Sequence, residues 1–128
     1  MDKSTILKTF NNHFEEFVED VRAVFPDDAE IETAATALGR LRKANPRLIM
    51  LTFKECVAGP YRQQIESGDL RFFVNKDYSL DVDGSGQESV ILAKVEALRT
   101  PVARMSEESQ GKVMKYMQNL VKLSDLYN

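Results

Sequence analysis

The sequence is short of the residues on which many kinds of site depend. It holds one cysteine, one histidine and no tryptophan in 128 residues. Because Cys56 has no second cysteine to pair with, no disulfide can form within the chain, and a reducing compartment is expected. One cysteine and one histidine cannot supply the four ligands of a Cys/His zinc site. We therefore expect neither a metal ion nor a cofactor.

Long hydrophobic runs are missing as well. No stretch approaches the roughly 20 apolar residues that a membrane-spanning helix needs. Charged and amide residues interrupt the N-terminal sequence MDKSTILKTFNNHF, so it lacks the apolar core of a signal peptide. We expect a protein of the cytoplasm or the nucleus, with no membrane partner.

What the sequence does contain is typical of a folded domain. Hydrophobic residues make up 43% of the chain and charged residues 29%, whereas disordered chains carry fewer apolar residues. The length suits one domain with a core of its own, so residues 1–128 are expected to form a single domain. The net charge of -3 is too small to imply a partner by itself.

Hydrophobic residues spaced three and four apart predict a series of helices. The clearest stripe belongs to a helix over residues 5–24, which Ser4 caps and Pro26 ends. The apolar face of this helix consists of Leu7, Phe10, Phe14, Phe17, Val21 and Val24.

Turn and cap residues predict where the later helices begin and end. A second helix opens at residues 26–28 and closes near Lys43. Asn45 caps a third helix with Pro46 in its first position, and Gly59 with Pro60 ends that helix. The order is completed by a short helix over residues 61–66, a turn capped by Asp69, a helix from about Gln87 that breaks at Thr100-Pro101, and a last helix capped by Ser106. The sequence therefore predicts an all-α fold, an irregular or orthogonal bundle of five to six helices.

Residues 79–86 are expected to form a flexible loop, because they are rich in turn residues and lack periodicity. The sequence DVDG at 81–84 invites comparison with the calcium loop of an EF-hand, which needs a glycine at position six and a glutamate at position twelve. With Gly84 at position six, position twelve is Val90. With Gly86 there, it is Leu92. The carboxylate that closes a calcium site is missing in both frames.

No constellation in the sequence indicates catalysis. Cys56 shares a helical face with Ile49 and Phe53, which favours burial as a small hydrophobic residue over use as a nucleophile with His13. The acidic pairs lie on predicted exposed faces or in first helical turns, where solvation and the helix dipole explain them. They are Glu15-Glu16, Glu19-Asp20, Asp27-Asp28 and Glu107-Glu108. We expect a protein that is not an enzyme.

Charge is distributed unevenly along the chain. Residues 1–38 carry a net charge of -6, residues 39–62 a net charge of +5, and the remainder a net charge of -2. The basic segment can pair with the acidic first helix of the same chain or simply be solvated, and we favour these two interpretations. Alternatively, it can bind an acidic protein or a nucleic acid. Its cationic side chains are Arg40, Arg42, Lys43, Arg47, Lys54 and Arg62.

Aromatic residues gather between residues 61 and 78. Adjacent phenylalanines at 72 and 73 cannot both face the same core from a short helix, so one is free to face a partner. The candidate interface residues here are Tyr61, Phe72, Phe73 and Tyr78.

Five pieces of sequence carry a resemblance to a known family. They are FNNHFEEF at 10–17, VFPDD at 24–28, KANPR at 43–47, SGDLRFF at 67–73 and KDY at 76–78. Together they resemble a small, uncharacterised helical family of nucleocytoplasmic large DNA viruses. The resemblance covers about residues 10–78. It implies a viral origin and an infected-cell or virion setting, and it transfers no catalytic residue.

Two functions remain open on the sequence. The first is a non-enzymatic protein-interaction or structural protein, such as a viral accessory or minor virion component, with a protein partner or a second copy of itself. The second is a nucleic-acid-associated regulatory factor that uses the basic segment 40–62.

Overall fold

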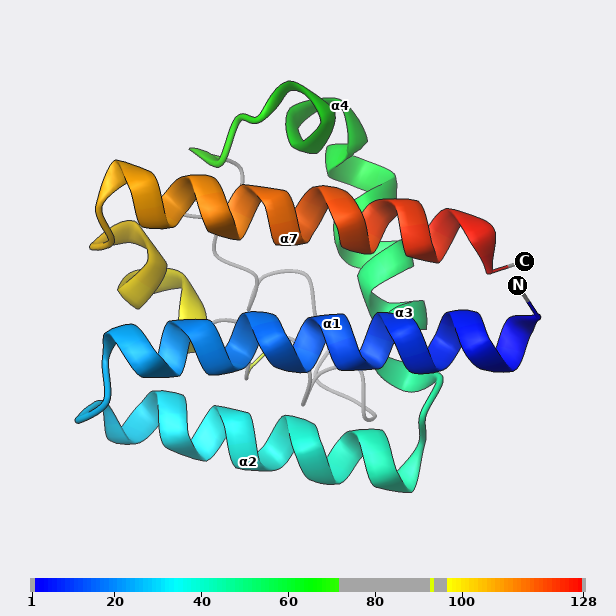
Figure 1. The fold of residues 1–128 in the computed structure, drawn as a ribbon, viewed down its shortest axis with the longest axis horizontal. Coiled ribbons are helices and arrows are strands. Elements are labelled where there is room, and N and C mark those ends of the chain that lie inside the picture. Colours follow the sequence, from blue (N-terminus) through cyan, green and yellow to red (C-terminus); the bar gives the residue numbers. More distant parts are fainter. Residues whose placement is uncertain (1, 72–92, 94–96, 128) are drawn as a thin grey trace.

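The computed structural model describes residues 2–71, 93 and 97–127 (Figure 1). These residues form helices joined by short connections, and none of them lies in a strand. The prediction of an all-α fold is confirmed. The helices are α1 (Lys3–Val24), α2 (Ala29–Ala44), α3 (Leu48–Phe53), the π-helical segment η1 (Lys54–Ala58), α4 (Gly59–Ser67) and α7 (Glu107–Leu126), and residues 97–103 are helical too.

The three long helices lie side by side, with α1 between α2 and α7 (Figure 1). Both neighbours run antiparallel to α1, so the N-terminus and the C-terminus of the chain lie at the same end of the bundle. The α3–η1–α4 segment crosses the three long helices and contacts each of them. One crossing segment over three nearly parallel helices makes the bundle irregular, as the short middle helices led us to expect.

Helix α1 forms because one of its faces is almost wholly apolar. Phe10 lies at the centre of the core, where its ring stacks on Phe14 and meets the edge of Phe53 from α3. The N-cap is Asp2, whose carboxylate accepts from the amide of Thr5 at 2.7 Å, so the prediction of Ser4 was wrong. A carboxylate two residues before Ser4 satisfies a free N–H group of the first turn and adds charge complementary to the helix dipole.

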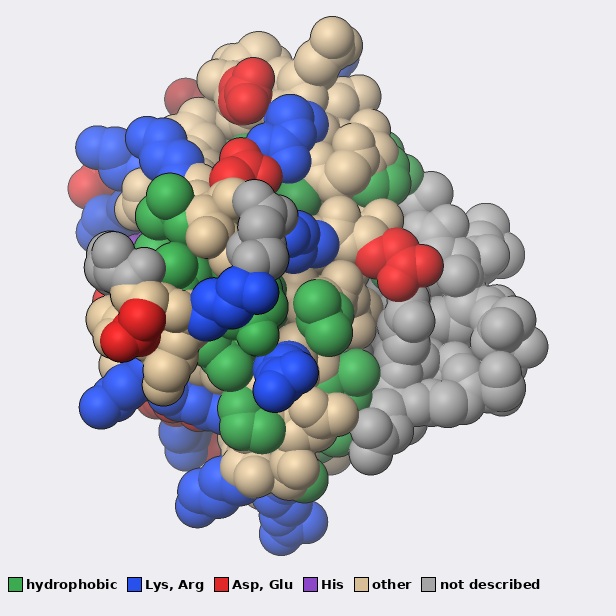
Figure 2. Space-filling model, turned by 90° about the vertical axis from the view of Figure 1, so that its right-hand side faces the viewer, with side chains coloured by type: hydrophobic (Ala, Val, Ile, Leu, Met, Phe, Trp, Pro, Cys, Tyr) green, Lys and Arg blue, Asp and Glu red, His purple; other side chains and the backbone are tan. Residues whose placement is uncertain are grey.

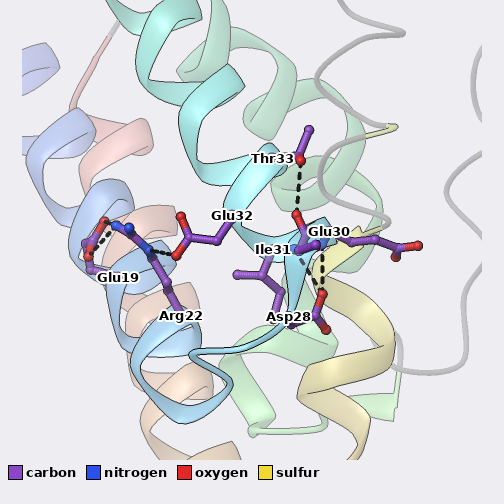
Figure 3. A network of polar contacts seen from close by, with 8 residues as sticks. Glu19, Arg22, Asp28, Glu30, Ile31, Glu32 and Thr33 are labelled. Atoms are coloured by element: carbon purple, nitrogen blue, oxygen red, sulfur yellow. Dashed lines mark hydrogen bonds and ion pairs between the residues drawn. The ribbon is translucent and has the colours of Figure 1, made fainter.

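Val24 departs from the predicted apolar face. Its side chain is 48% exposed, although it continues the stripe of Phe17 and Val21. Val24 is the last residue of α1, and Phe25 follows it as the C-cap. Helix α2 then begins at Ala29, where Asp28 accepts from the amides of Glu30 and Ile31 at 2.9 and 3.2 Å (Figure 3).

The connection between α2 and α3 corrects the predicted role of Asn45. Asn45 is the C-cap of α2, since its amide donates to the carbonyl of Leu41 at 2.8 Å. Helix α3 starts at Leu48 after Arg47, with no side-chain cap. The carbonyl of Pro46 instead accepts a hydrogen bond from the buried side chain of Asn11 at 2.9 Å, which ties this corner to α1.

Gly59 and Pro60 keep helical geometry, and the break predicted there falls at the next residue. The chain passes from α3 through η1 to Gly59, which has φ -61° and ψ -61°, and Tyr61 then leaves the helical region with φ -118° and ψ 20°. The amide of Gly59 donates to the carbonyl of Lys54, five residues earlier. A π turn therefore precedes the proline, and a kink follows it.

The remaining helix ends agree with the sequence at two of three points. Gly68 ends α4 in the left-handed conformation, and Ser106 caps α7 by accepting from the amide of Ser109, both as predicted. The predicted break at Thr100-Pro101 was wrong, because the helical residues extend to 103. Pro101 and Val102 are both buried there, so core packing outweighs the local preference of the proline.

Most of the predicted core residues within the described part of the chain are buried, whereas Val24 is exposed and Leu7 and Leu41 are only partly buried. The fully buried positions include Phe10, Val21, Ile31, Met50, Ile65, Leu98, Val102 and Leu120. They come from every helix of the bundle, so one core holds the described residues together. The predicted loop at 79–86 lies outside the described residues.

Candidate interaction surface

The predicted basic residues fall into two groups in the structure. Three of them are engaged within the chain, at three different places. Arg42 contacts Glu15 and Asn12 of α1 at 2.8 and 2.7 Å. Arg62 forms a two-pronged ion pair with Asp125 of α7 at 2.7 and 2.8 Å. The ammonium of Lys54 donates to the carbonyl of Tyr127 at 2.8 Å.

The other three remain at the surface. Arg40, Lys43 and Arg47 are exposed and form no ion pair with any of the described residues. They lie at the end of α2 and at the corner that leads into α3. The pairing or solvation that we favoured from the sequence therefore describes both groups, since Arg42 pairs with Glu15 of the first helix and the three cations of this corner face solvent.

The aromatic candidates can be followed at one position only. Tyr61 is half-buried at the kink of α4 and packs against the core. Phe72, Phe73 and Tyr78 lie outside the described residues.

Folding gathers the positive charges of three helices at one end of the bundle, which we call the basic end. It comprises residues 2–12, 37–55 and 117–127, where eight basic and three acidic side chains give a net charge of +5. Figure 2 looks onto this end and shows Lys and Arg side chains around a central group of hydrophobic ones. The basic side chains are Lys3, Lys8, Arg40, Arg42, Lys43, Arg47, Lys54 and Lys122.

The opposite end, which we call the acidic end, comprises residues 13–36 and 97–116. It carries ten acidic and five basic side chains, a net charge of -5. Arg22 offsets part of this charge by bridging Glu19 at 3.1 Å and Glu32 at 2.5 Å, and so links α1 to α2 (Figure 3). Most of the other carboxylates face solvent.

The division of charge between the ends does not follow from the stability of each helix alone. Helices α2 and α7 begin with acidic residues, which suit the positive end of a helix dipole. Helix α1 has the opposite order, with Lys3 and Lys8 near its start and Glu19 and Asp20 near its end. Because α1 runs antiparallel to its neighbours, its unfavourable order adds to the same two ends.

Exposed hydrophobic side chains occur at both ends. Leu51 of α3 is 48% exposed and lies one turn before Lys54, and Leu126 is 59% exposed beside Tyr127. Lys54 and Tyr127 are joined by a hydrogen bond, so both leucines belong to the basic end. At the acidic end, Val24 is the exposed aliphatic residue.

A groove of about 230 Å³ lies at the acidic end between α1 and α7. Its lining includes the apolar side chains of Phe17, Val21, Val24, Met105 and Val113, together with the charged side chains of Asp20 and Lys112. The sequence did not single out this groove, because its walls come from helices about 90 residues apart in the chain.

Tyr116 lies between the groove and the acidic face of α1. Its ring contacts His13 and Phe17, and its hydroxyl donates to Asp20 at 2.5 Å. This hydrogen bond to a carboxylate, with burial as a second cause, raises the pKa of Tyr116 to about 12. A neutral tyrosine that orients an acidic side chain stabilises the packing of α7 on α1.

His13 and Cys56, which were considered for catalysis or metal binding, pack against other side chains of the fold. His13 packs on Tyr116 and lies 3.6 Å from Glu16, while Cys56 is half-buried against the core. Within the described residues, no three His, Cys, Asp or Glu side chains converge in a way that could hold a metal ion. The stretch compared with a calcium loop, residues 79–86, falls outside them.

Comparison with known proteins adds no relative. No protein-family model matches the chain. No curated protein matches its sequence, and no solved structure matches its fold. Among the described residues, no helix is long and apolar enough to cross a membrane.

Proposed function

We propose that this chain is a non-enzymatic protein-interaction protein that docks through its charged ends. The observation that supports this is the collection of like charges from three antiparallel helices at opposite ends of one bundle. Surface charges that served only stability would alternate in sign, since like charges at close range repel and isolated surface pairs contribute little.

The basic end is the part of the surface best suited to a protein partner. It combines exposed leucines at 51 and 126 with Arg40, Lys43 and Arg47, which are exposed and form no ion pair within the described part of the chain. Interfaces typically join an apolar centre to a polar rim, and complementary charge speeds and orients the encounter. An acidic protein surface with an apolar depression would complement this end.

The cellular compartment and the viral context of this function are proposed from the sequence. The single cysteine supports a reducing compartment such as the cytoplasm or the nucleus. The resemblance of residues 10–78 to a helical viral family supports a role as a viral accessory or minor virion component.

Cross-linking with an amine-reactive reagent in cells that express the chain tests the docking surface. Lysines 3, 8, 43 and 122 report on the basic end, and lysines 112 and 115 report on the other half of α7. We expect cross-links to a partner protein from the first group and few from the second. A second arm uses the double variant Lys43→Glu with Arg47→Glu, which should lose the partner.

The matched control for that variant is Gln63→Glu with Ser67→Glu and Arg71→Glu. It changes the net charge by the same amount at exposed positions of α4 and shortly after it, outside both ends, so it should keep the partner. Equal loss in both variants, or cross-links spread evenly over all lysines, would contradict docking through the basic end.

A nucleic-acid-associated factor is the second candidate. The unpaired Arg40, Lys43 and Arg47 favour it, since such residues can contact phosphates. The acidic end weighs against it because it repels a long polyanion. A gel shift with duplex DNA at low and high salt decides: this candidate requires binding that falls steeply as salt rises, and no shift at low salt removes it.

A further inference from the structure

We infer that one partner of this chain is a second copy of itself, with the basic end of one copy seated on the acidic end of the next. This inference rests on the proposed function and specifies the partner. The two ends carry net charges of +5 and -5, so each copy presents both halves of a complementary contact.

The hydrophobic features of the two ends also correspond. The basic end projects Leu51 and Leu126, and the acidic end offers the groove beside Val24. A cavity of roughly 150 Å³ can hold benzene in another protein, so a groove of about 230 Å³ has room for a leucine side chain. Apolar contact at the centre with opposite charges around it is the usual anatomy of a specific interface.

The position of the two surfaces, at opposite ends of the bundle, favours contact along the long axis. A two-fold dimer joined end to end would place like end against like end and set positive charge against positive charge. The favourable contact is head to tail, and its surfaces lie at opposite ends of the long helices. Such a heterologous contact leaves one free surface at each end, so it produces open chains that lengthen with concentration.

Ionic strength should control this assembly. The charges surround the contact at the protein surface, where screening acts over about 8 Å at physiological salt and over about 30 Å in dilute salt. The weight-average mass in sedimentation velocity should therefore rise with protein concentration at low salt, and it should fall toward the monomer at high salt.

Two variants separate the ends. The basic-end variant, Lys43→Glu with Arg47→Glu, keeps its acidic end. The acidic-end variant, Asp27→Lys with Glu108→Lys, keeps its basic end. Each variant alone should sediment as a monomer at low salt. An equimolar mixture should form a one-to-one dimer, because the one intact basic end meets the one intact acidic end.

Circular dichroism and the unfolding midpoint establish that both variants are folded, since all four positions are exposed. The control Gln63→Glu with Ser67→Glu and Arg71→Glu lies outside both ends and should assemble like the unchanged chain. A monomer at every concentration and salt, self-association of either variant alone, or a mixture that stays monomeric would each overturn the head-to-tail contact.

This failure is distinguishable from failure of the proposed function. A chain that stays monomeric can still be cross-linked to a different acidic protein through its basic-end lysines, which would keep the proposed function and remove only the second copy as partner. A chain that neither self-associates nor cross-links to another protein would contradict both the second copy as partner and the proposed function.

Discussion

At the scale of single residues, the helix caps are the clearest local interactions. Asp28 accepts from two amides at the start of α2 and adds negative charge at the positive end of the helix dipole. We expect Asp28→Ala to lower the free energy of unfolding by about 1 kcal/mol, a typical cost of losing an N-cap. Urea denaturation measures it, and Asp27→Ala, one residue earlier and without such bonds, is the control. An equal loss in both variants would contradict the capping role.

Tyr116 gives a prediction in alkaline solution. Its hydrogen bond to Asp20 raises the pKa of Tyr116 from 10.0 to about 12 in the folded chain. A folded-state pKa above the unfolded value stabilises the fold fully below pH 10, and this contribution is lost as the pH rises toward 12. The unfolding free energy should therefore fall more steeply over this range in the unchanged chain than in Tyr116→Phe. Spectrophotometric titration of Asp20→Asn should show the pKa of Tyr116 moving back toward 10.0, and an unchanged titration would refute the role of Asp20.

At the scale of elements, the glycines separate two kinds of position. Gly111 lies inside α7 and has open space where a Cβ would be, whereas Gly68 ends α4 with φ +80°. We expect Gly111→Ala to stabilise the chain by about 1 kcal/mol through helix propensity, and Gly68→Ala to destabilise it by about 1 kcal/mol through left-handed strain. Thermal unfolding of the two variants side by side should show shifts of opposite sign. A shift of the same sign in both would show that backbone conformation does not decide the effect.

The helices themselves could be predicted from the sequence because apolar periodicity is a local property. Their boundaries could be predicted only where one signal acted alone, as at Gly68 and Ser106. At Gly59-Pro60 the break falls one residue later than predicted, at the kink of Tyr61, after a π turn that no local pattern encodes. At Asn45 the same residue suits the end of one helix and the start of the next, and the choice depended on the contact between Asn11 and Pro46.

At the scale of the whole molecule, the charged ends could not be predicted from the order of charges along the chain. The sequence places acidic residues in its first segment and basic residues in its second. Only the antiparallel packing of α1 between α2 and α7 brings Lys3 and Lys8 beside the basic end of α2, and Glu107 and Glu108 beside the acidic end of α1. The groove could not be predicted from the sequence for the same reason, because α1 and α7 come together only in the folded chain.

Two neighbouring residues of α3 distinguish what holds one molecule together from what joins two molecules. Met50 is fully buried in the core, and Leu51 beside it is 48% exposed at the basic end. Met50→Ala leaves a cavity and should lower the unfolding free energy by about 2–5 kcal/mol. Leu51→Ala removes little buried surface and should change it by less than about 0.5 kcal/mol.

In self-association, Leu51→Ala should have a larger effect than Met50→Ala, the reverse of their order in unfolding. An exposed leucine that contributes little to the fold contributes apolar area to a contact, so Leu51→Ala should weaken head-to-tail assembly in sedimentation at low salt, where the folded fraction of Met50→Ala still assembles. Urea denaturation in high salt, where the chain is monomeric, keeps the two measurements independent. If Leu51→Ala destabilised the monomer as much as Met50→Ala, Leu51 would be a residue that the fold itself requires. The basic end would then lose the apolar centre on which the contact depends.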